Sequence, residues 1–320
     1  MNPHRDVRPT TTPRVIGRLA LCVIIVYGLP IIFLSILNFP RTVDDVPVVQ
    51  RIAEDTKIGQ AQSYYDNDYS PGLDDIYVRT ARRAAQIFHV EDKVRTFVKD
   101  FHLQEKRVLE VGAGSGLLQD VVDDYTALDV APSARRFFHK PFIQASATAM
   151  PFDDETFDVV WTVWVLEHVS QPEQALSEIR RVTKNGGLLY LAPAWNCTSW
   201  AADGYEARPY SDFGLVGKLT KASIPVRMHP LYRMSYLLPI RFVRMLWLFV
   251  NRAPTALRYT KLNANFRTYW VPDSDAVNSL DSYEAYLWFI SRGDQCLDCA
   301  TTAREATEYE RWPLIIRVRK

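Results

Sequence analysis

A glycine-rich turn directly after an apolar run constrains the fold of this chain more than any other feature. The run 108–111 is short, apolar and rich in β-branched residues, which is typical of a buried strand. Gly112, Gly114 and Gly116 follow at alternate positions. Such a turn lets a ligand touch the backbone, and a helix starting at Leu117 would point its N–H groups at that ligand. The stretch therefore predicts a strand, a ligand-binding turn and a helix.

The spacing of these glycines argues against two common nucleotide-binding motifs. A dinucleotide fingerprint, G-x-G-x-x-G, counted from Gly112 would need a glycine where Leu117 stands. A P-loop needs Gly-Lys-Ser/Thr, and the turn has no lysine. The pattern that fits is E-x-G-x-G-x-G, from Glu110 to Gly116. It resembles motif I of the class I S-adenosylmethionine (SAM)-dependent methyltransferases. The resemblance implies that Glu110 meets the cationic amino group of the methionine part of SAM.

The residues after the turn continue an alternation of strands and helices. Further strands are expected at 125–129, 142–146, 158–162 and 188–192, and an antiparallel final pair at 286–290 and 314–318. Ser170-Gln171-Pro172-Glu173 predicts a capping box before the helix that precedes residue 185. We therefore expect an α/β, Rossmann-like, doubly wound and mostly parallel seven-stranded sheet with helices on both faces.

Two further stretches resemble the type 11 branch of these methyltransferases. Residues 149–158 are similar to its "LPF…FD" passage, and residues 163–169 to its "VLEHV" turn. Asp129 ends the second strand, where an acid can accept both ribose hydroxyls. The branch usually has an acid after strand three for the adenine amino group, but this chain has Ser146, so backbone groups around Ala147 would supply that contact. The resemblance covers residues 105–195. The SAM-binding candidates are Glu110, Gly112, Ala113, Gly114, Gly116, Asp129, Val130, Ser146, Ala147, Trp164 and Leu166.

Candidate catalytic and metal-binding residues are few. His168, in the "VLEHV" turn, is a candidate general base, although relatives with quite different acceptors share this turn, which favours a structural role. Asp273 and Asp275 could bind a metal or orient an acceptor, or could form an ordinary polar turn. Cys296 and Cys299 have no second Cys or His pair at zinc spacing, so no metal is predicted.

The N-terminal segment has the composition of a membrane anchor. Residues 19–37 carry no charge, and as a helix they would cover about 28 Å, close to the thickness of a bilayer core. A cleaved signal peptide is less favoured. Arginines before the segment predict a cytoplasmic N-terminus, which would place the rest of the chain away from cytosolic SAM. Gly28 and Pro30 could kink the segment into an in-plane anchor. We expect a single-pass or monotopic membrane protein with a cytosolic catalytic domain.

Residues 195–270, here named the cap segment, have an unusual charge. Between Tyr205 and Trp270 there are eleven Lys/Arg and two acids, whereas the whole chain has a net charge of +1. Aromatic residues are interleaved, so the segment suits an interfacial helix beside anionic headgroups. A helical cap with a solvated basic face is the plainer alternative, and nucleic-acid binding is less favoured.

These patterns predict a membrane-anchored methyltransferase that uses SAM and acts on a lipid-like or lipid-linked small molecule. The alternatives are a non-catalytic membrane scaffold that retains the fold and a methyltransferase of a soluble acceptor. The oligomeric state stays open. A cluster of tyrosines near residue 65 could cover the cofactor or merely pack as a loop. The expected division is 1–40 basic N-terminus and anchor, 41–104 linker and N-terminal helices, 105–194 SAM-binding core, 195–270 cap segment, and 271–320 final strands.

Overall fold

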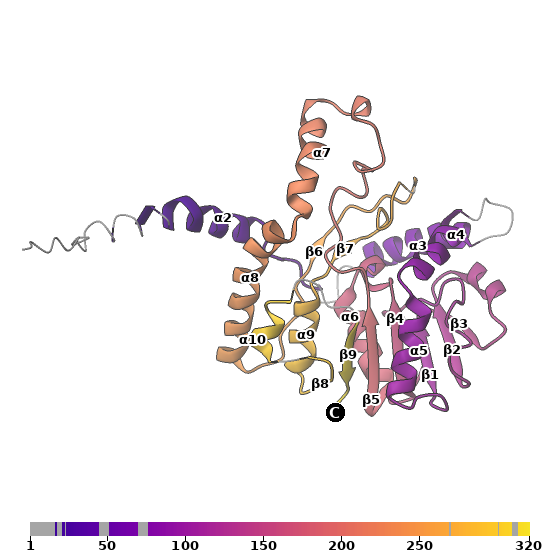
Figure 1. Ribbon diagram of the computed structural model, residues 1–320. Helices are drawn as coiled ribbons and strands as arrows, with labels where there is room; N and C mark the ends of the chain where they lie inside the picture. Colours follow the sequence, from indigo (N-terminus) through magenta and orange to yellow (C-terminus); the bar gives the residue numbers. More distant parts are fainter. Residues whose placement is uncertain are drawn as a thin grey trace, which may run out of the picture.

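The computed structural model has a seven-stranded sheet at its centre (Figure 1), and it describes residues 17, 21–22, 24–44, 51–69, 76–268, 270–299, 301–308 and 313–320. The strand order is β3-β2-β1-β4-β5-β9-β8. The first five strands in sequence pair in parallel, β9 is antiparallel to β5, and β8 is antiparallel to β9. The strands are β1 (Val108–Val111), β2 (Tyr125–Asp129), β3 (Phe142–Gln144), β4 (Phe157–Val163), β5 (Thr183–Ala192), β8 (Gln295–Cys296) and β9 (Leu314–Arg317). The predicted α/β class and the mixed seven-stranded sheet are confirmed.

Helices cover both faces of this sheet, and a small second sheet lies beside it. The second sheet pairs β6 (Thr260–Lys261) with β7 (Asn278–Ser279). The helices are η1 (a π-helix, Ile24–Gly28), α2 (Leu29–Leu37), α3 (Arg51–Asp68), α4 (Ile76–Ile87), α5 (Val90–Asp100), α6 (Pro172–Val182), α7 (Leu215–Met228), α8 (Pro230–Asn251), α9 (Ser282–Ile290) and α10 (Thr302–Glu305), with short 3-10 turns η2 (Pro132–Phe137), η3 (Leu166–His168) and η4 (Tyr210–Asp212). In Figure 1, α2 and α7 project from the body of the molecule.

The alternation of side chains along the strands creates two cores. In β1, Leu109 and Val111 pack with α6 and α9, whereas Val108 packs on the opposite face with α5. All three side chains are fully buried, because a parallel sheet with helices on both faces leaves neither face to solvent. This double burial explains why the strands of the sequence are almost continuously apolar.

The helix expected after the glycine turn is absent from residues 117–122, which form turns instead. Gln119 explains the difference, because its side-chain amide donates to the carbonyls of Gly116 (3.1 Å) and Phe137 (3.0 Å). These bonds tie the segment to η2 rather than to a helical ladder. The prediction of a helix with N–H groups aimed at the ligand was wrong.

The strand expected at 286–290 is also wrong, because these residues belong to α9. Asp281 begins the helix, and its carboxylate accepts a hydrogen bond from the Tyr283 N–H at 3.1 Å. The residues from Ser282 to Phe289 are all buried, so the helix is apolar on every side and its sequence shows no helical stripe. The strand that completes the sheet is β8, a two-residue element with a weak sequence signal.

The expected membrane segment contains a shorter helical run. Within 19–37, the described continuous helix covers 24–37, and residues 19, 20 and 23 lie outside the described residues. Fourteen helical residues span about 21 Å, whereas a bilayer core is about 30 Å thick. Among the residues that the structure describes, no helix is both long and apolar enough to cross a membrane. The spanning helix is therefore not confirmed.

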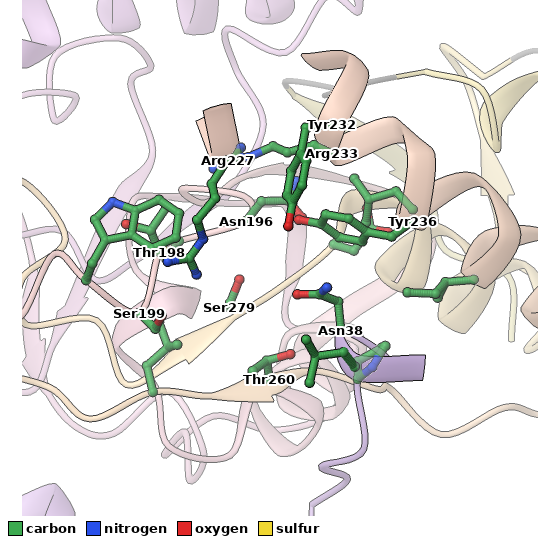
Figure 2. Close-up of a pocket in the computed structure, with 18 of the residues that line it drawn as sticks. Asn38, Asn196, Thr198, Ser199, Arg227, Tyr232, Arg233, Tyr236, Thr260 and Ser279 are labelled. Atoms are coloured by element: carbon green, nitrogen blue, oxygen red, sulfur yellow. The ribbon is translucent and has the colours of Figure 1, made fainter. Parts of the chain in front are cut away.

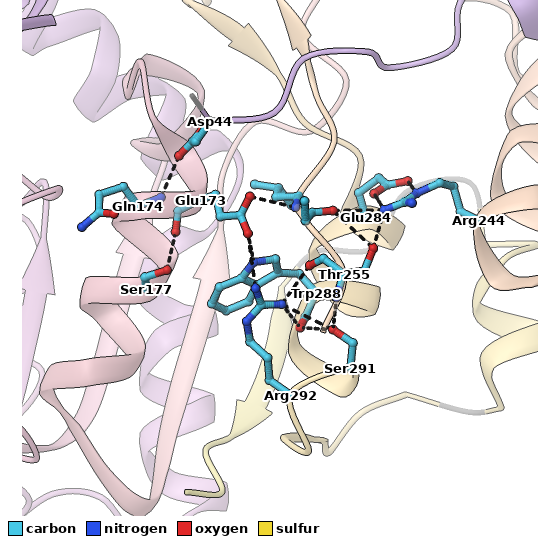
Figure 3. Close-up of polar contacts among 12 residues, drawn as sticks. Asp44, Glu173, Gln174, Ser177, Arg244, Thr255, Glu284, Trp288, Ser291 and Arg292 are labelled. Atoms are coloured by element: carbon cyan, nitrogen blue, oxygen red, sulfur yellow. Dashed lines mark hydrogen bonds and ion pairs between the residues drawn. The ribbon is translucent and has the colours of Figure 1, made fainter. Parts of the chain in front are cut away.

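Buried polar contacts attach the C-terminal helices to the core (Figure 3). Pro172 opens α6 as expected, but the N-cap residue makes no side-chain cap, so the capping-box prediction was wrong; the Asp44 carboxylate instead accepts a hydrogen bond from the Gln174 N–H at 2.8 Å. The Glu173 carboxylate instead accepts hydrogen bonds from the Trp288 indole (2.8 Å) and the Leu257 N–H (3.0 Å). Arg292 contacts the same carboxylate at 3.3 Å. Glu173 thus joins α6 to α9 and to the chain after α8.

Helix α8 has an inverted distribution of side chains. Arg233, Arg241 and Arg244 are at most 7% exposed, and Arg244 forms a two-point ion pair with the buried Glu284 of α9 at 2.7 and 3.0 Å. Arg241 similarly binds Asp281 at 2.7 and 2.9 Å. Seven large apolar side chains of α8 are more than half exposed: Leu231, Phe242, Val243, Leu246, Trp247, Phe249 and Val250.

Candidate active site

A cavity of about 510 Å³ opens where β1, β2 and β4 end, which is the usual ligand position in an open parallel sheet. Seven of the residues singled out in the sequence line it: Gly112, Asp129, Val130, Ser146, Ala147, Trp164 and His168. The other predicted residues do not line it, namely Glu110, Ala113, Gly114, Gly116 and Leu166. The sequence motifs therefore converge on one cavity, although not every residue of each motif faces it.

The glycine turn adopts a backbone that only glycine takes without strain. Gly112, Gly114 and Gly116 have φ angles of +72°, +48° and +72°. A Cβ at Gly112 would lie 2.2 Å from a methyl group of Val165, and one at Gly114 would lie 3.0 Å from the Tyr69 hydroxyl. The turn therefore needs glycine both for its conformation and for the close approach of Val165 and Tyr69.

Asp129 is held at the end of β2 by backbone donors. Its Oδ2 accepts a hydrogen bond from the Gly114 N–H (2.8 Å), and its Oδ1 accepts one from the Ala131 N–H (2.9 Å). Burial raises the pKa of this carboxyl, and the N–H donors act against that rise. Each oxygen has a second lone pair, so a carboxylate in this position can still accept hydroxyl groups of a ligand.

Glu110 lies beneath the cavity rather than in its wall. Its side chain is 5% exposed and accepts a hydrogen bond from the Tyr125 hydroxyl. Burial raises the pKa of Glu110 to about 7, and the hydrogen bond from Tyr125 partly opposes the rise. Contact between Glu110 and the amino group of SAM stays a prediction. Ala113 and Leu166 are likewise core residues, 6% and 1% exposed.

The tyrosine cluster forms one side of the cavity. Tyr65 and Tyr69, from α3 and the residue after it, line the cavity together with Tyr77 of α4. The Tyr65 hydroxyl donates to Oδ2 of Asp275 at 2.7 Å, and burial raises the pKa of that hydroxyl well above its usual value. The cluster lines the cavity and also packs as a small apolar core, so a role in covering the cofactor stays a prediction.

Several other lining residues escaped the sequence analysis. Lys261 and Leu262 come from β6 and the residue after it, and Phe266 and Val277 from the segment between β6 and β7. They carry no motif, and only the fold brings them against β1 and β2. The excess of aromatic and basic residues in the cap segment was the one available signal.

His168 lies at the edge of the cavity among three acids. Its Nδ1 is 3.5 Å from Oδ2 of Asp275, and its Nε2 is 3.8 Å from Oε1 of Glu167. Burial alone lowers the pKa of His168, but the charges of Asp275, Glu167 and Asp273 outweigh burial and raise it. The pKa of Glu167 is raised to about 7, first by burial. The cluster can therefore accept a proton near neutral pH.

The same cluster has the donor set of a metal site. Ligand atoms of Glu167, His168 and Asp273 lie within 4.8 Å of one another, and Oε2 of Glu167 has no hydrogen-bond partner among the described residues. Cys296 and Cys299, the other pair considered for a metal, are joined in a disulfide, so neither offers a free thiolate. The side chains of His168 and its neighbouring acids are sufficient for a proton-accepting role.

Comparison with known proteins identifies the central part of the chain. Residues 109–191 match the family model described as a methyltransferase domain. The demethylmenaquinone methyltransferase of Renibacterium salmoninarum is 41% identical over 96 residues, which cover 27% of this chain and 40% of that protein. A protein of Mycobacterium ulcerans, named as a probable phthiotriol/phenolphthiotriol dimycocerosates methyltransferase, is 37% identical over 112 residues, which cover 31% and 43%. The chain spans about two fifths of the length of these relatives.

Similarity to solved structures covers only part of the chain. A phosphoethanolamine N-methyltransferase of Haemonchus contortus, in complex with phosphoethanolamine and S-adenosylhomocysteine, is 16% identical with a TM-score of 0.39. The match covers 48% of this chain and 36% of that one. At a TM-score below 0.5, this likeness supports no functional conclusion.

The sheet order, the glycine turn and the family match define the class of this part of the molecule. Residues 109–191 form a class I SAM-dependent methyltransferase domain, and SAM is its cofactor.

Proposed function

We propose that this protein methylates a lipid-like small molecule at a membrane surface. The observation that carries the proposal is the single cavity shared by the glycine turn, Asp129 and His168. It joins a SAM-binding motif to a group that can accept a proton. The lipid-like acceptor and the membrane setting have separate support, described below.

The residues around the cavity divide into roles along a bound SAM. When bound, SAM supplies a methyl group on a sulfonium, which is transferred by in-line displacement to a nucleophilic atom. Gly112 and the turn behind it would admit the methionine end, Asp129 would accept the ribose hydroxyls, and Ser146 with Ala147 would border the adenine. Trp164 would close the remaining wall. Because positioning provides much of the rate in such a displacement, these rigid walls are the main contribution of the chain.

His168 would accept the proton that the acceptor loses. If the acceptor atom is a hydroxyl oxygen or an acidic carbon, it forms a bond to the methyl carbon and releases one proton. His168 in its neutral form would take that proton, and the carboxylates of Asp275 and Glu167 would stabilise the resulting imidazolium. Tyr65 holds Asp275 in place through its hydroxyl. This role predicts that activity increases as His168 loses its proton.

The inverted helix α8 supports a membrane surface as the place of action. Trp247, Phe249 and Val250 are 58–72% exposed, and large exposed apolar side chains on one helix are typical of elements that bind a membrane surface or another partner. Helix α2 packs against α8, and Phe33 and Leu37 of α2 are both 65% exposed. An in-plane anchor of this kind needs no spanning helix and leaves the catalytic domain on the cytosolic side. Both relatives named above act, by their names, on quinone or lipid-like molecules.

The test is transfer of label from methyl-labelled SAM to a host-cell extract, followed by partition into lipid, aqueous and protein fractions. Label in the lipid fraction that is lost with Asp129→Ala supports the proposal. Label in the aqueous or protein fraction would retain the methyltransferase and exclude the lipid acceptor. No label together with no SAM binding would favour a non-catalytic scaffold.

A matched control separates loss of the site from loss of the fold. Asp123 is an exposed acid in the same connection between β1 and β2. Asp123→Ala should bind SAM and transfer label as the wild type does. His168→Gln should bind SAM normally and lose most of the transfer, which separates proton acceptance from cofactor binding.

A further inference from the structure

A second cavity lies under the helices of the cap segment. It has a volume of about 320 Å³ and is bordered by the end of α2, by α7 and α8, and by the chain after β5. Figure 2 shows polar side chains from these separate elements directed toward one hollow, including Arg227, Tyr232 and Ser279. Nothing in the methyl-transfer mechanism uses this cavity.

The charges around this second cavity favour an anion. Arg227, Arg233 and Arg258 line it. Among the described residues of the lining, Asp281 is the sole acid, and both of its oxygens are already engaged by Arg241 at 2.7 and 2.9 Å. Arg227 and Arg258 therefore face the cavity with no carboxylate of its described lining left to neutralise them, and Arg233 adds a third positive charge to the lining.

The cavity also contains a buried hydrogen-bond donor that lacks an acceptor. The side-chain amide nitrogen of Asn196 has no partner among the described residues and is shielded from solvent. Asn196 has a φ of +57°, so its backbone in the turn after β5 is in the left-handed conformation. Hydroxyl groups of Ser199, Thr260 and Ser279 line the same space. Guanidinium, amide and hydroxyl donors together suit a phosphate group.

The surroundings of the cavity indicate that the anion is attached to an apolar molecule. The framing helices carry large apolar side chains that are at least 59% exposed, among them Leu37 of α2, Val226 of α7 and Leu231 of α8. Leu37 itself lines the cavity. A free phosphate makes no contact with these apolar side chains, whereas the acyl chains of a lipid would cover them.

We propose that this second cavity binds the phosphate of an anionic membrane lipid, with its acyl chains along α2 and α8. The inference rests on the membrane association proposed above but not on methyl transfer. The arginines bind the headgroup at the level of the membrane surface, and the exposed faces of the helices enter the apolar layer. The cavity is a docking site for the protein, distinct from the cavity that contains Asp129.

Vesicle binding by the full chain tests this site. Vesicles of phosphatidylcholine with and without phosphatidylglycerol are compared by co-sedimentation. Because charge-assisted hydrogen bonds to phosphate are strong, we expect about tenfold tighter binding to the anionic vesicles. Arg227→Gln should remove most of that preference. Arg252→Gln removes the same charge at the far end of α8 and should keep the preference. SAM binding by each variant shows that the fold is intact.

Three results would overturn the site. Equal binding to both kinds of vesicle would leave membrane association standing and exclude a headgroup site. An equal loss with Arg227→Gln and Arg252→Gln would show general electrostatic attraction instead. Saturable calorimetric binding of glycerol phosphate, abolished by Arg227→Gln and combined with no preference for anionic vesicles, would assign the cavity to a soluble phosphate. Loss of methyl transfer would bear only on the proposed function.

Discussion

Helices α6 and α8 bury opposite kinds of side chain. In α6, Ala175, Leu176, Ile179 and Val182 face the sheet, and charged residues face outward. In α8, three arginines are among the buried residues, and phenylalanine, tryptophan and valine side chains face outward. The first arrangement is what water selects, because apolar surface leaves contact with solvent. The second is the arrangement expected if the outward face of α8 enters the apolar layer of a membrane, as proposed above.

The comparison also separates two ways to hold a helix in place. Hydrophobic packing holds α6, and removing a buried side chain there costs the transfer energy plus a cavity. Ion pairs to Asp281 and Glu284 hold α8, and removing one partner leaves a buried charge. The two helices should therefore respond differently to substitution.

The largest effect is expected from Arg244→Met. It leaves the carboxylate of Glu284 buried without its partner, so the free energy of unfolding should fall by about 3–5 kcal/mol. Denaturant titration measures the loss. The double variant Arg244→Met/Glu284→Leu should recover much of it, because no buried charge then remains. A loss below about 1 kcal/mol for the single variant would show that α8 is held by its apolar contacts, as α6 is.

The next effect concerns Glu110, a buried acid whose partner is the neutral Tyr125. Because its pKa is about 7 in the folded protein, the folded state binds more protons than the unfolded state above pH 4.5. Its contribution to stability is thus present at low pH and is lost as pH increases through 7, by on the order of 3 kcal/mol. Glu110→Gln should flatten this fall in denaturation curves across pH 4–8. The exposed Glu105→Gln should leave the fall unchanged.

A smaller effect is expected in the pH dependence of catalysis. Neighbouring carboxylates raise the pKa of His168, and Asp275 has the largest such influence. If neutral His168 accepts the proton, kcat/KM should increase with pH through that raised pKa. Asp275→Asn should move the increase to lower pH while reducing the plateau. An increase that stays at the same pH would show that His168 is not the group that titrates. The exposed Asp212→Asn should change nothing.

The smallest effect on stability is expected on the outer face of α8. Trp247→Asn and Phe249→Asn should each change the free energy of unfolding by less than about 0.5 kcal/mol, because both side chains are already exposed. Binding to vesicles should nevertheless fall. Ile87→Asn in α4, at a position 63% exposed, is the matched control and should bind vesicles normally. Unchanged vesicle binding in the α8 variants would contradict the membrane interpretation of the inverted face.

Local patterns predicted much of the fold. The glycine turn, the strand before it and Asp129 could be located because each depends on residues within a few positions of one another. Two errors have the same physical origin. The side chain of Gln119 replaced a helical ladder, and complete burial removed the helical stripe from α9. In both places tertiary structure overrode the local pattern.

The candidate site was less predictable, because it depends on contacts between distant parts of the chain. Tyr65 and Asp275 are 210 positions apart, and only the fold brings their side chains together. Glu110 belongs to the motif, yet the direction of its side chain is set by Tyr125 of the neighbouring strand. The positive charge of the cap segment could be counted in the sequence. The burial of three of its arginines in α8 could not be predicted.

The β6–β7 pair separates the two cavities. Thr260 of β6 lines the cavity under the cap segment, and Lys261, the next residue, lines the cavity that contains Asp129, since successive strand residues point to opposite sides. Any shift of this two-residue strand alters both walls at once. If a lipid in one cavity changes the affinity for SAM in the other, thermodynamic reciprocity requires SAM to change the affinity for that lipid by the same factor. Cofactor supply would then control how long the protein resides on its membrane.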